Sequence, residues 1–140
     1  MDAIQAAILS VKLAQLAVEN EHRRSVAAAY DARLRPAGFK TIEPVAGATE
    51  SVYHLYVVEV ENRHEVREQM MGVGIETGIH YPMPLHMQQA FAHLGVGKGK
   101  LPHAEAAAAR VLSLPICGAI TDDQIDYVCE VFLATARPAR

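Results

Sequence analysis

The stretch from Gly72 to His86 constrains the fold of this chain more than any other. It reads GVGIETGIHYPMPLH, with two closely spaced glycines at its start and two prolines near its end. Glycine is a common helix terminator, and proline has no N–H with which to continue a regular hydrogen-bond ladder. We therefore predict a helix that ends at the glycines, a strand over residues 75–81 and a stiff loop after it.

Three side chains of this stretch can move protons or bind a charged ligand, namely His80, Tyr81 and His86. The two prolines between them fix φ, which favours a preorganised pocket wall over a solvated turn. The two histidines could share a metal ion if the proline segment turned back sharply, but the sequence offers no third ligand at a suitable spacing. Nucleophilic catalysis has little support, because neither cysteine lies in this stretch.

The run GIETGIHYPMPLHMQQAF resembles the corresponding segment of the DegT/DnrJ/StrS family. These proteins are aminotransferases that depend on pyridoxal phosphate (PLP) and act mostly on nucleotide-linked keto-sugars. The resemblance extends to MDAIQAAILSVKL at the start, VYHLYVV in the middle, and LSLPI and TDDQIDYV near the end. It covers nearly all 140 residues but only the C-terminal part of the family sequence.

The resemblance implies an α/β (α+β) fold, in which helices pack a small mixed sheet as in the small C-terminal domain of fold-type I PLP aminotransferases. Residues 1–140 would form one domain, with a helical segment over residues 1–36 and the small α/β domain over residues 37–140. In relatives the matching loop lies beside the cleft for cofactor and sugar. By resemblance, His80, Tyr81 and His86 would therefore bind the nucleotide-sugar substrate.

The resemblance also implies an incomplete enzyme. Lys12, Lys40, Lys98 and Lys100 are the only lysines, and none stands in the family's S-x-x-x-x-K-N segment. We therefore expect a chain that lacks the N-terminal PLP-binding large domain, does not hold PLP covalently and is inactive alone. The alternative is a non-catalytic binding or oligomerisation module that retains the small-domain fold. A homodimer or a separate large domain would be the partner.

Composition argues against several other functions. Thirteen basic and sixteen acidic residues leave a net charge of −3, which gives no electrostatic footprint for nucleic acid. No apolar run approaches the roughly 18 residues of a membrane span, and the N-terminus lacks a signal-peptide pattern. We therefore expect no membrane partner and a cytoplasmic location. Cys117 and Cys129 lack metal spacing, and we expect both to be reduced and buried.

The N-terminal half is expected to begin with two helices, which are followed by two β-forming stretches. Residues 3–16 form a helix that is apolar over most of its circumference, so it is either an ordinary core helix or one that meets another domain or chain. An amphipathic helix over residues 19–35 follows a bend near residues 18–20. Edge and central strands are expected over residues 39–45 and 51–60.

A helix with an inner face of Val66, Met70 and Val73 should come next, capped by Asn62 and Glu65 in capping-box spacing. Together with the flanking strands it could form a βαβ crossover, although an antiparallel or mixed sheet fits the sequence equally well.

The C-terminal half carries clearer signals. One or two helical turns over residues 86–94 and a surface loop over residues 95–100 should precede a helix that starts at Pro102 and runs through residues 104–111. Residues 112–116 should be extended. Thr121 and Gln124 form a second capping box. It opens a final helix whose inner face is Ile125, Val128, Cys129 and Phe132.

Overall fold

The computed structural model describes residues 2–43 and 50–139. Its helices are α1 (Ala3–Leu13), α2 (Leu16–Leu34), α3 (Arg63–Gly72), α4 (Pro102–Arg110) and α5 (Asp122–Thr135). Two short 3₁₀ helices, η1 (Leu85–Met87) and η2 (Gln89–Leu94), lie between α3 and α4. The strands are β1 (Tyr56–Glu59) and β2 (Val111–Leu114).

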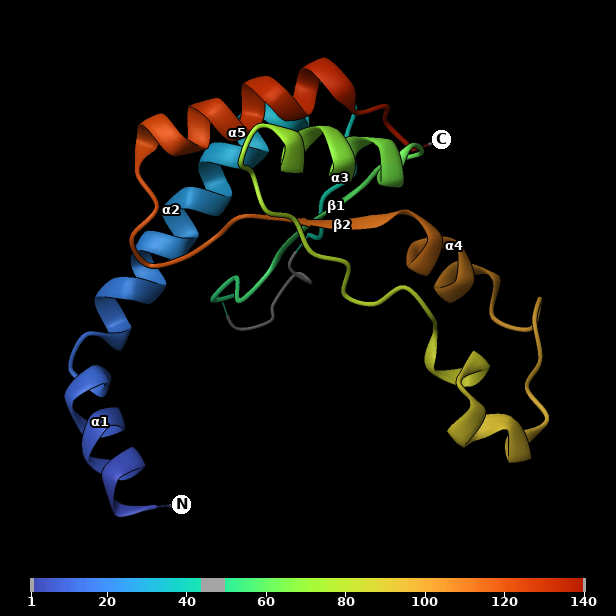
Figure 1. The fold of residues 1–140 in the computed structure, drawn as a ribbon, viewed down its shortest axis with the longest axis horizontal. Coiled ribbons are helices and arrows are strands. Elements are labelled where there is room, and N and C mark those ends of the chain that lie inside the picture. The colour runs from blue at the N-terminus through green and yellow to red at the C-terminus, as the bar shows by residue number, and fades with distance from the viewer. Residues whose placement is uncertain (1, 44–49, 140) are drawn as a thin grey trace.

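The two strands form an antiparallel sheet in which Tyr56 pairs with Leu114 and Glu59 with Val111. α3 and α5 lie on one side of this sheet, and α2 packs against α5 (Figure 1). The predicted fold class, a small sheet packed by helices, is confirmed. Of the arrangements that the sequence left open, the antiparallel one is found for the two named strands.

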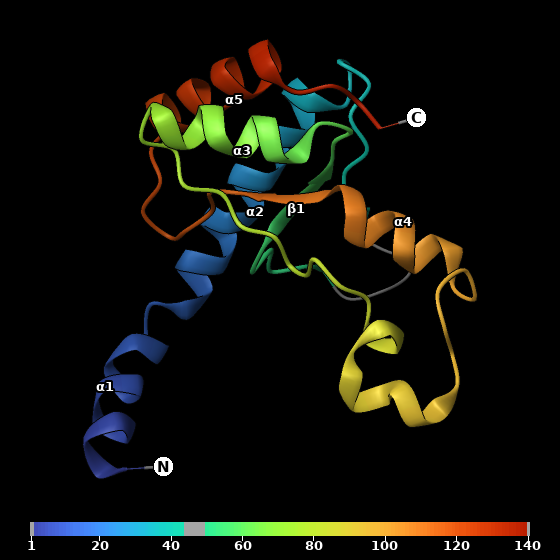
Figure 2. The ribbon, with the colours of Figure 1, turned by 45° about the vertical axis from the view of Figure 1, so that its right-hand side comes forward.

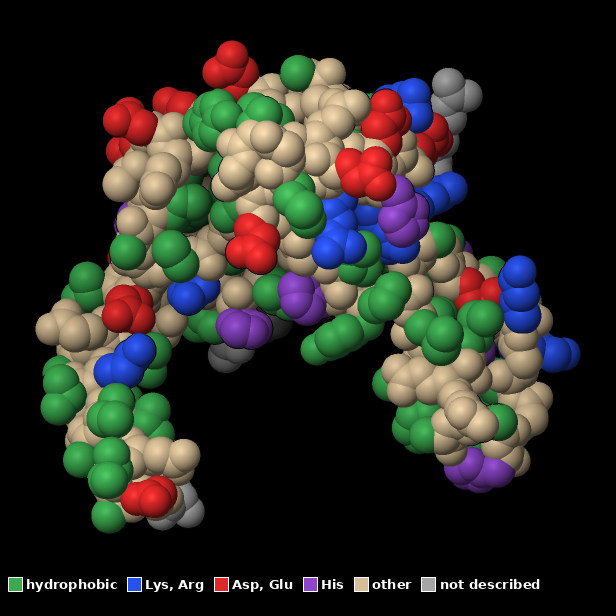
Figure 3. Space-filling model, viewed as in Figure 1, with side chains coloured by type: hydrophobic (Ala, Val, Ile, Leu, Met, Phe, Trp, Pro, Cys, Tyr) green, Lys and Arg blue, Asp and Glu red, His purple; other side chains and the backbone are tan. Residues whose placement is uncertain are grey.

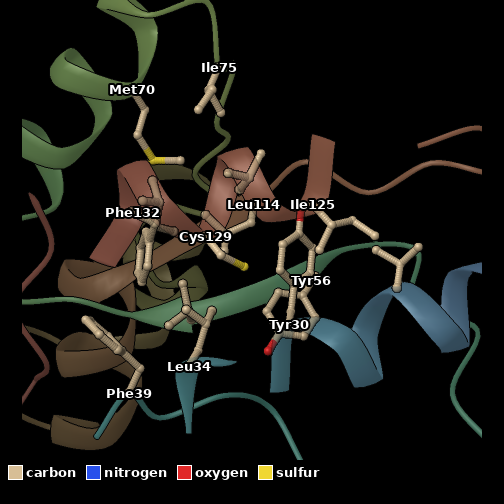
Figure 4. Packing of buried hydrophobic residues seen from close by; sticks show 14 of the residues in the cluster. Tyr30, Leu34, Phe39, Tyr56, Met70, Ile75, Leu114, Ile125, Cys129 and Phe132 are labelled. Carbon is tan, nitrogen blue, oxygen red and sulfur yellow. The ribbon is translucent and has the colours of Figure 1, made fainter. Parts of the chain in front are cut away.

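One apolar core lies between the sheet and the helices (Figure 4). The rings of Phe39 and Phe132 lie 4.9 Å apart, and those of Tyr30 and Tyr56 lie 4.8 Å apart. Each buried tyrosine satisfies its hydroxyl: Tyr30 donates to the Pro115 carbonyl at 2.8 Å, and Tyr56 donates to Asp31 at 2.6 Å. Burial raises the pKa of both phenols. The core therefore joins α2, β1, β2 and α5 without leaving these polar atoms unpaired.

Two parts of the chain project from this core on the side away from α3 and α5: α1, and a segment of residues 81–101 that we call the arm (Figures 1 and 2). α1 has no buried residue, and its apolar side chains are exposed, Val11 and Ile4 by more than 70%. Hydrophobic side chains also gather on the arm (Figure 3). The alternative that α1 is an ordinary core helix is therefore wrong for this chain, which leaves its apolar surface uncovered.

The predicted strand over residues 75–81 is wrong. Only Gly78 makes a bridge, by donating its N–H to the Ser113 carbonyl at 3.0 Å and accepting from the Ser113 N–H at 2.8 Å. Gly74 turns the chain with a φ of 83°, and Pro82 has no N–H for pairing beyond the bridge. Regular pairing is thus restricted to one residue.

Two further strand predictions were too long. Residues 51–60 contain only β1, because Tyr53 adopts a left-handed φ of 45° that interrupts extended backbone. The predicted edge strand over residues 39–45 is reduced to a bridge between Thr41 and Val58, while residues 44 and 45 lie outside the described part.

The bend expected near residues 18–20 lies instead at residues 14–15, between α1 and α2. Neither residue there is glycine or proline, so the sequence carried no signal for this break. Val73, expected on the inner face of α3, is 48% exposed, whereas Val66 and Met70 are buried as predicted.

The predicted capping box at Asn62 is also wrong. Its amide donates to Glu65 at 2.9 Å and to the Thr135 carbonyl at 3.0 Å, and its oxygen accepts from the Arg137 N–H at 2.9 Å. Asn62 therefore ties the start of α3 to the end of α5 instead of capping its own helix.

Other local predictions are confirmed. Pro102 opens α4, β2 covers residues 112–114 of the predicted extended stretch, and Thr121 and Gln124 make the reciprocal capping bonds of α5. Cys129 is buried and Cys117 is exposed, both as free thiols, so the expected burial holds for one and fails for the other. Burial raises the pKa of Cys129 to about 11.

The exposure of α1 predicts that charges are tolerated there. Leu9→Glu and Leu13→Glu should change the free energy of unfolding by no more than about 0.5 kcal/mol, as is usual for surface positions, and should improve solubility. Phe132→Ala is the matched core control and should cost about 3–5 kcal/mol. Urea unfolding monitored by circular dichroism measures all three. A loss at Leu9 or Leu13 as large as that at Phe132 would show that this face is packed.

Candidate functional site

A groove of about 720 Å³ lies between the arm and α4. Its walls are almost entirely apolar, with contributions from Met83, Leu85, Phe91, Leu101, Ala104 and Val111. The polar groups on this surface are those of His80, Tyr81, His86 and Gln88. An apolar hollow with a few fixed polar groups is the usual form of a small-molecule site. The three residues predicted from the sequence therefore line the same groove.

His80 is held at the end of the groove nearest the sheet. Its Nδ1 lies 2.9 Å from the hydroxyl oxygen of Ser113 on β2. Its ring also meets the ring of Tyr81 edge to face, with centroids 5.6 Å apart. Tyr81 is 72% exposed and forms the rim. The proline-rich stretch thus presents one anchored ring and one free aromatic side chain side by side.

His86 is anchored in a different way. Its Nε2 lies 3.1 Å from a carboxylate oxygen of Glu105, which stands in the first turn of α4, and its side chain is only 7% exposed. The same carboxylate accepts the N–H of Gly99 at 2.8 Å and that of Leu101 at 3.4 Å. Glu105 therefore holds two separate parts of the arm against α4, one at His86 and one at Gly99 and Leu101.

These contacts determine the ionisation of Glu105. Partial desolvation favours the neutral acid, but the hydrogen bonds from His86, Gly99 and Leu101 favour the carboxylate and outweigh it, so the pKa of Glu105 is lowered from 4.5. The carboxylate form is the one that can accept all these donors. The anchor is consequently present at neutral pH.

Sequence reasoning found His80, Tyr81 and His86 but not the positioning roles of Ser113, Glu105 and Gly78. Ser113 stands in a short apolar stretch and Glu105 in the first turn of α4, and neither lies in the proline-rich motif that drew attention to the histidines. Their partners are 33 and 19 residues away in sequence, so no local pattern could have linked them.

The residues of the groove do not fit a metal centre or a covalently held PLP. Across residues 2–43 and 50–139 no group of three His, Cys, Asp or Glu side chains is placed to hold a metal ion. None of the four lysines is among the residues that line the groove, and no arginine is there to receive a phosphate. The groove can bind and orient a ligand, but it supplies no amine for a Schiff base.

No helix in the described part of the chain is both long and apolar enough to cross a membrane.

Comparison with known proteins agrees with the resemblance seen in the motifs. The profile of the DegT/DnrJ/EryC1/StrS aminotransferase family matches residues 1–133. The dTDP-3-amino-3,4,6-trideoxy-alpha-D-glucose transaminase of Streptomyces venezuelae is 40% identical over 116 residues, 83% of this chain. The UDP-2-acetamido-2-deoxy-3-oxo-D-glucuronate aminotransferase of Pseudomonas aeruginosa is 38% identical over 130 residues, 92% of this chain.

Similarity extends to solved structures. The S. venezuelae protein DesV, solved in complex with a ketimine intermediate, superposes on 96% of this chain with a TM-score of 0.83 and 37% identity. In each of these comparisons the chain spans only about a third of the relative, namely 31%, 35% and 36% of its length.

The anchor at Glu105 predicts a titration that can be observed at backbone amides. Because the pKa of the folded carboxylate is lowered, its stabilising contribution is fully present above the unfolded value of about 4.5 and is lost as the pH falls through the lower folded value. The ¹H–¹⁵N signals of Gly99 and Leu101 should therefore shift together with a midpoint below 4.5. Glu105→Gln, which cannot ionise, is the control and should abolish the transition. A midpoint above 4.5 would contradict the anchor.

Proposed function

We propose a function from the premise that the chain belongs to the DegT/DnrJ/EryC1/StrS aminotransferase family. In this proposal it is the small C-terminal part of a PLP-dependent aminotransferase of nucleotide-linked keto-sugars, acting in amino-sugar, polysaccharide or antibiotic-sugar biosynthesis. The observation that carries the proposal is that one groove gathers His80, Tyr81 and His86. Two relatives named for their dTDP- and UDP-linked sugars support the substrate class.

The groove suits this role because its polar groups are fixed before a ligand arrives. His80 is held by Ser113 and His86 by Glu105, so neither ring has to lose much rotamer freedom on binding. The apolar walls can cover the carbon skeleton of a sugar or a base, while the two rings and the Tyr81 hydroxyl meet its oxygens. The chemistry of amino transfer belongs to the cofactor elsewhere in the enzyme, and no step of it is assigned to this chain.

A large PLP-binding domain is the proposed partner. Residues 1–140 form one domain in this view, and the part of the family sequence that the chain does not span supplies the Schiff-base lysine. Both projections carry exposed apolar side chains, among them Ile8 and Leu13 on α1 and Leu85 and Leu94 on the arm. Such uncovered surface marks interaction sites. A binding or oligomerisation module, with a second copy of the chain on these surfaces, remains the alternative, and a cytoplasmic location stays a prediction.

The first test asks whether the chain alone holds PLP. Purified protein is mixed with PLP, reduced with borohydride and mapped by peptide mass spectrometry. We expect no lysine to be labelled above the level found in the same protein denatured in urea, because no lysine lines the groove. A stoichiometric adduct at one lysine of the folded chain would overturn the proposed inactivity of this part.

The second test asks whether the groove binds nucleotide sugars. UDP- and dTDP-linked sugars should shift the ¹H–¹⁵N signals of the arm and α4 in the labelled chain. His80→Gln or His86→Gln should raise the dissociation constant about tenfold or more, which is the effect of one lost hydrogen bond. His54→Gln, at an exposed position outside the groove, is the matched control and should change nothing.

Two results would favour the alternative. No shift in the groove at millimolar ligand, together with a concentration-dependent dimer in light scattering, would support an oligomerisation module. A monomer at high concentration that does bind the sugars would count against it.

A further inference from the structure

The His80 ring is fixed from two sides by residues outside the arm. Ser113 contacts this segment three times: its backbone exchanges two hydrogen bonds with Gly78, and its side-chain oxygen lies 2.9 Å from Nδ1 of His80. Ser113 lies in β2 between buried leucines and is itself only 4% exposed. One rigid residue of the sheet therefore sets both the backbone and the ring of the segment that enters the groove.

Gly78 contacts the His80 ring from the other side. A Cβ atom at this position would lie 2.4 Å from Cε1 and 3.1 Å from Nδ1 of His80. The 2.4 Å distance is far below van der Waals contact, and the obstructing atom belongs to a ring that Ser113 already holds. Gly78 does not have a positive φ, so space and not backbone conformation demands glycine here. The ring occupies the place that a side chain would fill.

The contact with Ser113 also decides which nitrogen carries the proton. A serine hydroxyl has one hydrogen, and a buried donor left without an acceptor is costly. Among the described residues the Ser113 hydroxyl has one hydrogen-bond partner, Nδ1 of His80. The hydroxyl therefore donates to Nδ1, which must be unprotonated in the neutral ring. The proton of the neutral imidazole then resides on Nε2.

We propose that Ser113 and Gly78 are positioning residues that hold His80 in the groove as its Nε2–H tautomer. Nε2 has no hydrogen-bond partner in the described part of the chain and is the nitrogen left for a ligand. His80 is then a hydrogen-bond donor, and the group it recognises is an acceptor oxygen. That this oxygen belongs to a nucleotide sugar rests on the proposed function, whereas the tautomer does not.

The tautomer can be measured directly in the ligand-free full chain. ¹⁵N-histidine-labelled protein at about pH 9, where imidazoles are neutral, gives separate signals for protonated and unprotonated ring nitrogens. The His80→Gln variant identifies the His80 signals by their loss. We expect one tautomer, with a protonated Nε2 and an Nδ1 shifted by hydrogen bonding. A proton on Nδ1, or an averaged ring like that of exposed His54, overturns the proposal.

Substitutions test the two positioning residues. Ser113→Ala should replace the single tautomer by averaged signals, and Ser113→Thr, which keeps the hydroxyl, should restore it. Gly78→Ala should have the same effect as Ser113→Ala by displacing the ring, and it remains available if Ser113→Ala does not fold. Gly97→Ala, with open space around its added Cβ, is the matched control. Signals unchanged in Ser113→Ala and Gly78→Ala overturn the positioning roles.

This experiment separates the inference from the proposed function, because no ligand takes part. If the Nε2–H tautomer is found but nucleotide sugars do not bind, the proposed function fails and the tautomer stands. If the sugars bind through a ring that is protonated on Nδ1, the reverse holds.

Discussion

The pairing of β2 on both of its edges is the constraint on which the rest of the structure depends. One edge pairs with β1, and the other meets Gly78 through two hydrogen bonds to Ser113. Successive side chains of a strand point to opposite faces, so Leu112 and Leu114 can enter the core while Ser113 turns to the other face. The strand β2 thereby both completes the core and fixes His80. A groove attached to this strand inherits the rigidity of the core.

The arm depends on few contacts by comparison. None of its residues is buried. Its main side-chain contact with the rest of the chain is the one between His86 and Glu105 of α4, and His80 is anchored just before the arm begins. Segments with little buried apolar surface are the least stable parts of a fold. Two imidazoles with fixed partners thus substitute for a hydrophobic anchor. The side chains that would face a ligand are also those that hold the wall in place, so binding and local order are coupled here.

Local signals predicted the parts of the fold that local interactions determine. The helix start at Pro102 and the capping box of Thr121 were correct because their bonds close within three or four residues. Asn62 carried the same signal but is bonded to the end of α5, and a tertiary contact outweighed the cap. The strand over residues 75–81 failed because pairing needs a partner that sequence does not show. The groove's histidines were found from the proline-rich motif, whereas their positioning residues lie far away in the chain.

The apolar side chains of this chain fall into two groups: one group forms the core, and the other lies exposed on α1 and the arm. The core under α3 and α5 buries Tyr30 and Tyr56 and gives both of their hydroxyls hydrogen-bond partners. α1 and the arm leave the core on the opposite side and keep their leucines in solvent (Figure 3). An apolar surface that a fold does not use for its own stability is available to be covered by another. In the proposed function the covering body is the part of the family sequence that this chain does not span, since the chain matches about a third of each relative. The groove would then close between two surfaces, of which this chain provides the one that carries the imidazoles.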